Sequence, residues 1–154
     1  MQRWYETKKG QRHIIHWSEN FAIKNEEIDK DHKILFKIAN DAFLMSQEGA
    51  DKTKLKEVIT KLLDYFKSHF EHEENFMKEI NYPRIEHHQK LHHSIIELTN
   101  RLLKGIPSMD TKTFELELAL FVEKHLVTHI EYDDMKIKHF LNGDDEMSIV
   151  LDDM

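Results

Sequence analysis

Four long segments of the sequence repeat their apolar residues every three or four positions, the spacing of one face of an α-helix. They run from Asn25 to about Gly49, from Asp51 or Thr53 to about Asn81, from Pro83 to about Gly105, and from Asp110 or Thr111 to Asn142-Gly143. The turns between them are short, and the 154 residues include only 4 Gly and 2 Pro. The spacing therefore predicts an all-α fold, an antiparallel up-down four-helix bundle.

The segments outside this repeat divide the chain into three parts. Residues 1–24 show no sustained period, and we expect an extended N-terminal arm that packs over the bundle. Residues 25–143 form the bundle, and residues 144–154 form an acidic C-terminal tail with a short apolar patch at 149–151. The arm and the tail are the candidate contacts for a protein partner or for self-association.

Composition excludes several classes of protein. The chain has no Cys, so disulfides, iron–sulfur clusters and thiolate zinc sites are excluded. A net charge of −7 without a basic face argues against binding to nucleic acid. No run of about 18 apolar residues occurs, and the N-terminus lacks the apolar core of a signal peptide. We therefore expect no membrane insertion and a cytoplasmic location.

Histidine is unusually abundant, with 12 residues spread along the chain. Residues four apart on a helix lie roughly 40° apart around its axis. Three such pairs fall on the apolar faces of the last three predicted helices: His69 with Glu73, His88 with His92, and His125 with His129. His32 lies on the apolar face of the first predicted helix. Several neutral imidazoles in one core cannot satisfy each other's hydrogen bonds, but metal ions can. Histidine and carboxylate ligands without sulfur suit iron, manganese or zinc.

The residues around these histidines resemble the hemerythrin family, particularly its bacterial members. The similarity runs from about Trp17 to Phe140 and is carried by Ile28-Asp29-Lys30-Asp31-His32, His69-Phe70-Glu71-His72-Glu73-Glu74, Tyr82-Pro83 with His88 and His92, and His129-Ile130 with Asp134. The resemblance implies a di-iron centre. In it His88, His92 and His129 bind one iron, His32 and His69 bind the other, and Glu73 and Asp134 bridge both beside an oxo or hydroxo group.

The same resemblance implies a function: reversible binding of dioxygen at an open position on the two-histidine iron, for storage, delivery or sensing, and no enzyme activity. By position, we expect Leu35, Phe70, Leu126 and Ile130 to line the oxygen pocket.

Two further residues, Asp29 and His125, are candidates for contacts around the ligands. Asp29, one turn before His32, either orients that ring or is an exposed acid at the helix start.

His125 departs from the family, which usually has tryptophan at this position. It shares a helix face with His129 and is expected to point toward the centre. There it is either a packed neighbour of the ligands or a hydrogen-bond and proton donor that shortens the life of the oxygen adduct. By contrast, His72, His87 and His93 follow or precede a ligand directly and are expected to face solvent.

The spacing of His129 and Asp134 conflicts with a regular helix. Residues five apart in an α-helix lie about 140° from each other, so one metal pair cannot reach both. We therefore predict a π-type turn or a kink near residues 130–133.

Two other functions remain open. One is a di-iron oxidase or peroxidase, if only a slow one, but ferritin-like enzymes use Glu-x-x-His pairs that are missing here. The other is an iron or redox sensor with a short-lived oxygen adduct, whose output would pass through the arm or the tail.

Overall fold

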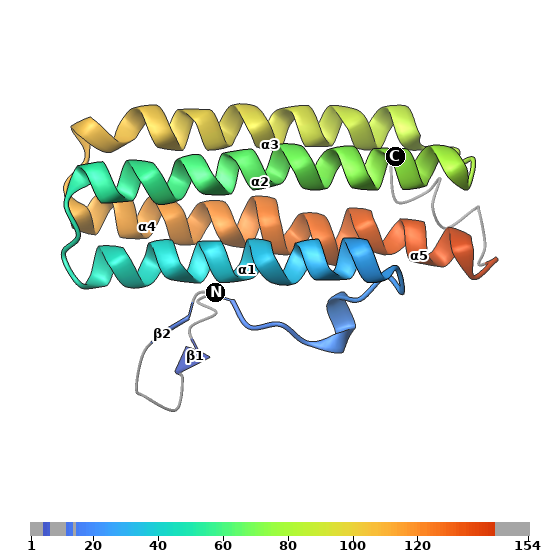
Figure 1. The fold of residues 1–154 in the computed structure, drawn as a ribbon, viewed down its shortest axis with the longest axis horizontal. Coiled ribbons are helices and arrows are strands. Elements are labelled where there is room, and N and C mark those ends of the chain that lie inside the picture. Colours follow the sequence, from blue (N-terminus) through green and yellow to red (C-terminus); the bar gives the residue numbers. More distant parts are fainter. Residues whose placement is uncertain (1–4, 7–11, 14, 144–154) are drawn as a thin grey trace.

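The computed structural model describes residues 5–6, 12–13 and 15–143. Four long helical rods lie side by side and alternate in direction (Figure 1). The first three are α1 (Glu26–Gln47), α2 (Lys52–Glu79) and α3 (Ile85–Gly105). The fourth is composite: α4 (Thr111–Phe121), two π-helical segments η3 (Val122–Val127) and η4 (His129–Asp134), and α5 (Met135–Leu141). The predicted all-α four-helix bundle is confirmed.

Side-chain caps fix three of the helix starts. The Oδ1 atoms of Asn25, Asp51 and Asp110 accept hydrogen bonds from the backbone N–H three residues later, at 3.1, 2.9 and 2.7 Å. Such caps satisfy N–H groups that the first helical turn leaves without partners. The turn after α1 contains Gly49, whose φ of 75° is the left-handed conformation that glycine tolerates best. A short 3-10 turn, η2 (Ile106–Ser108), links α3 to α4.

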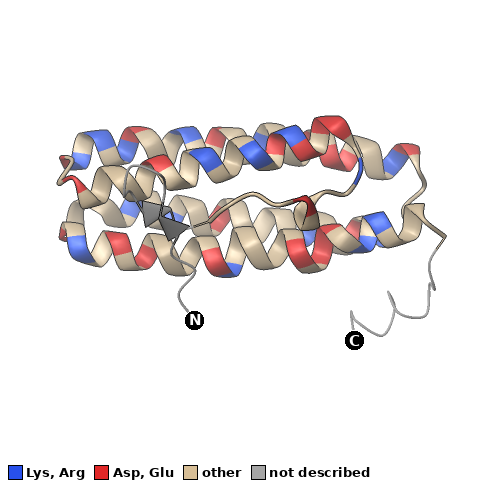
Figure 2. Cartoon of the chain, turned by 90° about the horizontal axis from the view of Figure 1, so that it is seen from below, with Lys and Arg blue, Asp and Glu red and all other residues tan. Residues whose placement is uncertain are grey.

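The described part of the N-terminal segment lies along α1. Strands β1 (Tyr5–Glu6) and β2 (Arg12–His13) pair antiparallel, and the chain then passes through a 3-10 turn, η1 (Glu19–Phe21). Asn40 holds Ile15 at both backbone groups: its Oδ1 accepts the N–H at 3.1 Å and its Nδ2 donates to the carbonyl at 2.7 Å. Charged residues of both signs lie on the outer faces of the helices (Figure 2). The N-terminal segment runs across one face of the bundle in the same view.

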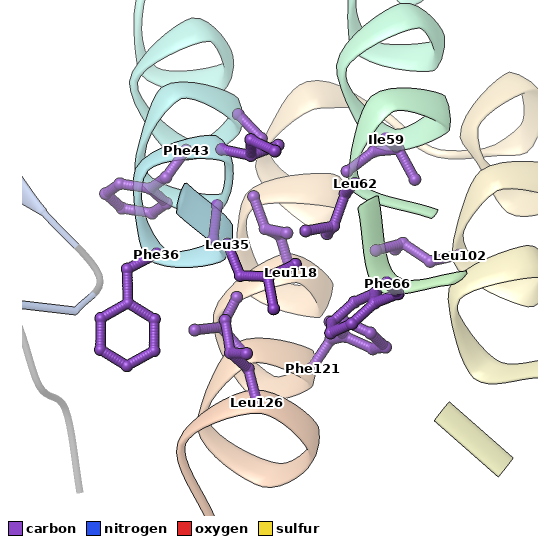
Figure 3. Packing of buried hydrophobic residues seen from close by; sticks show 14 of the residues in the cluster. Leu35, Phe36, Phe43, Ile59, Leu62, Phe66, Leu102, Leu118, Phe121 and Leu126 are labelled. Carbon is purple, nitrogen blue, oxygen red and sulfur yellow. The ribbon is translucent and has the colours of Figure 1, made fainter. Parts of the chain in front are cut away.

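The apolar core has two parts. The larger cluster fills the middle of the bundle, where Leu35, Leu118 and Leu126 point toward one another (Figure 3). The smaller cluster contains Ile28, Met77 and Ile137. His32, Glu73 and Asp134 each lie between residues of the two clusters along their own helices. A buried polar layer therefore separates the two apolar parts. No helix in the described ranges is long and apolar enough to cross a membrane.

Candidate metal centre

The polar layer contains all seven predicted metal ligands, and the four rods each contribute to it. Every one is at most 6 % exposed: His32 on α1, His69 and Glu73 on α2, His88 and His92 on α3, and His129 and Asp134 on η4. Isolated carboxylates are costly to bury, so their position here requires compensating partners.

Glu73 divides its two carboxylate oxygens between two groups of histidines. Its Oε1 lies 2.7 Å from Nε2 of His88 and 2.9 Å from Nε2 of His92. Its Oε2 faces the other way, 3.3 Å from Nε2 of His69 and 3.7 Å from Nε2 of His32. The carboxylate thus spans the space between a pair of histidines on α3 and a pair shared by α1 and α2.

Asp134 repeats this arrangement from the fourth rod. Its Oδ1 lies 2.9 Å from Nε2 of His88 and 3.3 Å from Nε2 of His129. Its Oδ2 lies 3.1 Å from Nε2 of His32. Both carboxylates therefore direct one oxygen to a three-histidine group and the other oxygen to a two-histidine group.

The π-helical segment η4 brings His129 and Asp134 to the same centre. Because a π-helix repeats its hydrogen bonds every five residues, residues five apart lie about one turn above each other. The predicted π-type turn is thus confirmed, and it spans His129–Asp134. The sequence did not predict the second π segment, η3, beside which the Thr128 hydroxyl donates to the Glu123 carbonyl at 2.9 Å.

The ligand atoms meet the requirements of two metal sites. One set, from Glu73, His88, His92, His129 and Asp134, offers donor atoms that all lie within 4.8 Å of one another, and so does a second set from His32, His69, Glu73 and Asp134. Oε2 of Glu73, Nε2 of His129 and both oxygens of Asp134 are buried without a hydrogen-bond partner. Buried polar atoms without partners are rare in native proteins, and coordination of a cation would satisfy all of these. The residues fit a pair of metal ions.

Electrostatics couple the histidines to the two carboxylates. Burial alone would lower the pKa of His32, but the adjacent carboxylates of Asp134 and Glu73 outweigh it and raise the pKa to about 9. The same balance raises the pKa of His88 to about 10 and that of His129 to about 9. In turn, the surrounding histidines lower the pKa values of Glu73 and Asp134 against the effect of burial. The two carboxylates are therefore anions, as metal ligands must be.

Three carboxylates that sequence reasoning did not assign hold the outer nitrogens of the histidines. Nδ1 of His69 donates to Asp31 at 3.0 Å, Nδ1 of His92 to Glu74 at 2.8 Å, and Nδ1 of His129 to Asp133 at 3.0 Å. Each bond leaves Nε2 free to coordinate. The signal was present, because Asp31, Glu74 and Asp133 each stand next to a predicted ligand, but a neighbour in sequence does not disclose which ring it faces.

Comparison with known proteins agrees with this geometry. The sequence profile of the Hemerythrin HHE cation binding domain matches residues 24–141. The chain belongs to the hemerythrin family. A bacteriohemerythrin of Campylobacter jejuni is 34% identical over 117 residues, covering 75% of this chain and 86% of that protein. The myohemerythrin of Theromyzon tessulatum is 30% identical over 122 residues, covering 79% and 89%.

The four residues expected to line an oxygen pocket, Leu35, Phe70, Leu126 and Ile130, are all buried. Phe70 contacts a predicted ligand directly, since its ring stacks on that of His92 at 3.8 Å between centroids. Leu35, Leu126 and Ile130 belong to the large apolar cluster with Phe70. Their side chains exclude water from that side of the polar layer.

The structure does not bring His125 or Asp29 into the centre. His125 is half-buried in a groove between α3 and α4, with its ring centroid 5.4 Å from that of Phe121. Oδ1 of Asp29 accepts the N–H of Ile23 at 2.8 Å and so anchors the N-terminal segment instead of orienting His32.

The histidines next to the ligands differ in their surroundings. His87 and His93 are exposed, as the sequence predicts. The side chain of His72 is 38% exposed, and its Nδ1 donates to Oδ2 of Asp31 at 2.9 Å. His72 and the ligand His69 therefore share one carboxylate oxygen.

Proposed function

We propose that this protein is a non-haem di-iron protein that binds dioxygen reversibly. The observation that carries the proposal is the division of each carboxylate, Glu73 and Asp134, between a three-histidine and a two-histidine group. His88, His92 and His129 would hold one iron and His32 and His69 the other, with both carboxylates as bridges. The ligands themselves accept iron, zinc or manganese. The choice of iron therefore rests on membership of the hemerythrin family.

The unequal number of histidines gives the two metal positions different roles. The two-histidine group offers fewer protein ligands, so we assign the open position to that side. When bound there in the ferrous state, the iron pair supplies the electrons with which dioxygen is held. The residues of the chain keep the geometry fixed, because ligands on four rods and three outer carboxylates hold the rings in place.

The apolar residues decide whether binding is reversible. Leu35, Phe70, Leu126 and Ile130 are each at most 5 % exposed. A dry pocket would limit the access of protons and water to the metal pair. The residues of the chain therefore favour a carrier or store over an enzyme.

One observation favours the alternative of an oxidase, a peroxidase or a short-lived sensor. A groove between α2 and α3 is lined in part by Phe70, His92 and Glu74, and the side chain of Glu74 is 25 % exposed. Solvent thus reaches the hydrogen-bond partner of a ligand. A location in the cytoplasm and a contact through the arm or tail stay predictions, and residues 144–154 lie outside the described part of the chain.

Metal analysis combined with an optical spectrum tests the proposal. We expect about two irons per chain, and a visible band that appears when the reduced protein meets air and disappears under argon. Rapid oxidation without a reversible band would support the alternative function, and absence of iron would refute both. The neighbours His87 and His88 give a matched pair of variants: His88→Gln should lose iron, whereas His87→Gln, at an exposed position, should retain it.

A further inference from the structure

Asp31 is a buried carboxylate that collects three donors. Its Oδ2 accepts from Nδ1 of His69 at 3.0 Å and from Nδ1 of His72 at 2.9 Å, and its Oδ1 accepts from the Tyr65 hydroxyl at 3.2 Å. The side chain of Asp31 is only 6 % exposed. Three donors, all of them from α2, fix this α1 carboxylate in place and hold it where it faces the outer nitrogen of His69.

The two metal positions differ in how their histidines are supported from outside. On the three-histidine side, Glu74 holds His92 and Asp133 holds His129. Those two carboxylates are 25% and 18% exposed. Water therefore screens their charges more than it screens that of Asp31.

On the two-histidine side, the support comes from Asp31 alone. The second histidine of that group, His32, has a buried Nδ1 with no hydrogen-bond partner among the described residues. Any influence of an outer carboxylate on this metal position must therefore pass through the bond between Asp31 and His69.

From this asymmetry we propose that Asp31 is a positioning residue that selectively sets metal affinity and reduction potential at the two-histidine site. The inference rests on the proposed function, because it assigns roles within the same pair of sites. A carboxylate on Nδ1 fixes the tautomer that presents Nε2 to the metal, and it makes the imidazole a stronger donor. A stronger donor favours the more highly charged ion. Asp31 therefore holds the potential down at the site assigned to dioxygen.

A titration with Co²⁺ that resolves two binding steps tests this selectivity. Asp31→Asn should weaken one step about 10- to 100-fold, the usual effect of losing an outer partner of a metal ligand, and leave the other step unchanged. Glu74→Gln should weaken the other step, and the double variant should weaken both. The Nδ1–H resonance of His69 in the cobalt protein should shift in Asp31→Asn but not in Glu74→Gln.

Tyr65→Phe provides the control for a structural role. It removes one donor from Asp31 but leaves the bond to His69 intact, so it should lower the melting temperature without changing either binding step. If Asp31→Asn does not yield folded protein, Asp31→Ser, which keeps an acceptor without the charge, replaces it. In the iron protein, the midpoint potential should rise and oxidation in air should slow with either variant at Asp31.

The outcomes separate the two proposals. Failure of the unaltered protein to bind two metal ions would refute the proposed function and this inference together. Two ions bound normally, with Asp31→Asn weakening both steps equally or Tyr65→Phe weakening them as much, would overturn only the role of Asp31.

Discussion

The ring of Phe70 lies flat against the ring of the ligand His92, with the planes 8° apart and the centroids separated by 3.8 Å. Phe70 is also within 5.6 Å of His69 and 6.2 Å of His129, measured between ring centroids. The same side chain lines the groove between α2 and α3. Phe70 thus covers one face of the His92 ring at a groove that His92 itself also lines.

Replacing Phe70 with Ala should open the centre to this groove. We expect oxidation in air to accelerate while both irons remain bound, because Phe70 excludes water but coordinates nothing. Truncation of a buried Phe typically costs about 3–5 kcal/mol in the free energy of unfolding. Stopped-flow absorbance and urea unfolding measure the two effects. Phe66→Ala, one turn away in the same core, is the matched control: similar destabilisation without faster oxidation would show that exposure of His92 is the cause.

Replacing His125 with Trp should leave the rate of oxidation unchanged. His125 lines the groove between α3 and α4 beside Phe121, Leu98 and Leu120, and no hydrogen bond connects it to the ligands among the described residues. A tryptophan in this groove would cover more apolar surface and should raise the melting temperature. Oxidation in air and thermal unfolding are followed on the same sample. A slower oxidation would contradict the structure and return His125 to the oxygen chemistry.

The helices could be predicted from sequence because their signals are local. Asn25, Asp51 and Asp110 cap the helix starts at which the apolar period begins. Likewise, the seven ligand positions followed from spacing, helix face and family resemblance, and they meet in one buried layer. The conflict between His129 and Asp134 even predicted an irregular turn, because geometry left no other way for both to reach one centre.

The remaining contacts depend on distances between helices, which a single sequence does not contain. Asp31 on α1 reaches His69 on α2, and Glu74 on α2 reaches His92 on α3. The second π segment, η3, could not be predicted for another reason: the sequence contains no counterpart there of the spacing conflict that revealed η4. Similarly, Asp29 faces the path of the N-terminal segment, which follows from packing and not from a periodic pattern.

Replacing Asn40 with Ala should release the N-terminal segment from α1. The side chain makes two hydrogen bonds to the backbone of Ile15, and each typically contributes about 0.5–1.5 kcal/mol. We expect faster amide hydrogen exchange at residues 15–23 with little change within α2 and α3. Asp41→Ala is the matched control, because the exposed ion pair between Asp41 and Lys37 contributes little to stability. Equal exchange in both variants would show that the aromatic contacts of Trp17 and Phe21 suffice.

The metal-free protein should lose stability as the pH rises from about 6 to about 9.5. The pKa values of His32, His88 and His129 are raised from 6.5 to about 9, about 10 and about 9 by the buried carboxylates. A histidine whose pKa is raised by folding contributes stability that is complete below its unfolded pKa. That contribution is lost as the pH rises through the pKa of the folded state. The reason is that the folded chain binds these protons more tightly than the unfolded chain does, and it releases them over this interval. Urea unfolding of chelator-treated protein at several pH values measures the loss.

Metal loading should reverse the sign of this dependence. A metal ion binds the neutral imidazoles, so protons compete with it, and its contribution to stability increases as the histidines lose their protons. The iron-loaded protein should therefore hold or gain stability over the same interval. Glu73→Gln in the metal-free state should reduce the loss, because it removes one of the two carboxylates that raise the pKa of His32 and His88. A metal-free protein whose stability is flat between about pH 6 and about pH 9.5 would show that the buried histidines do not carry these protons in the folded state.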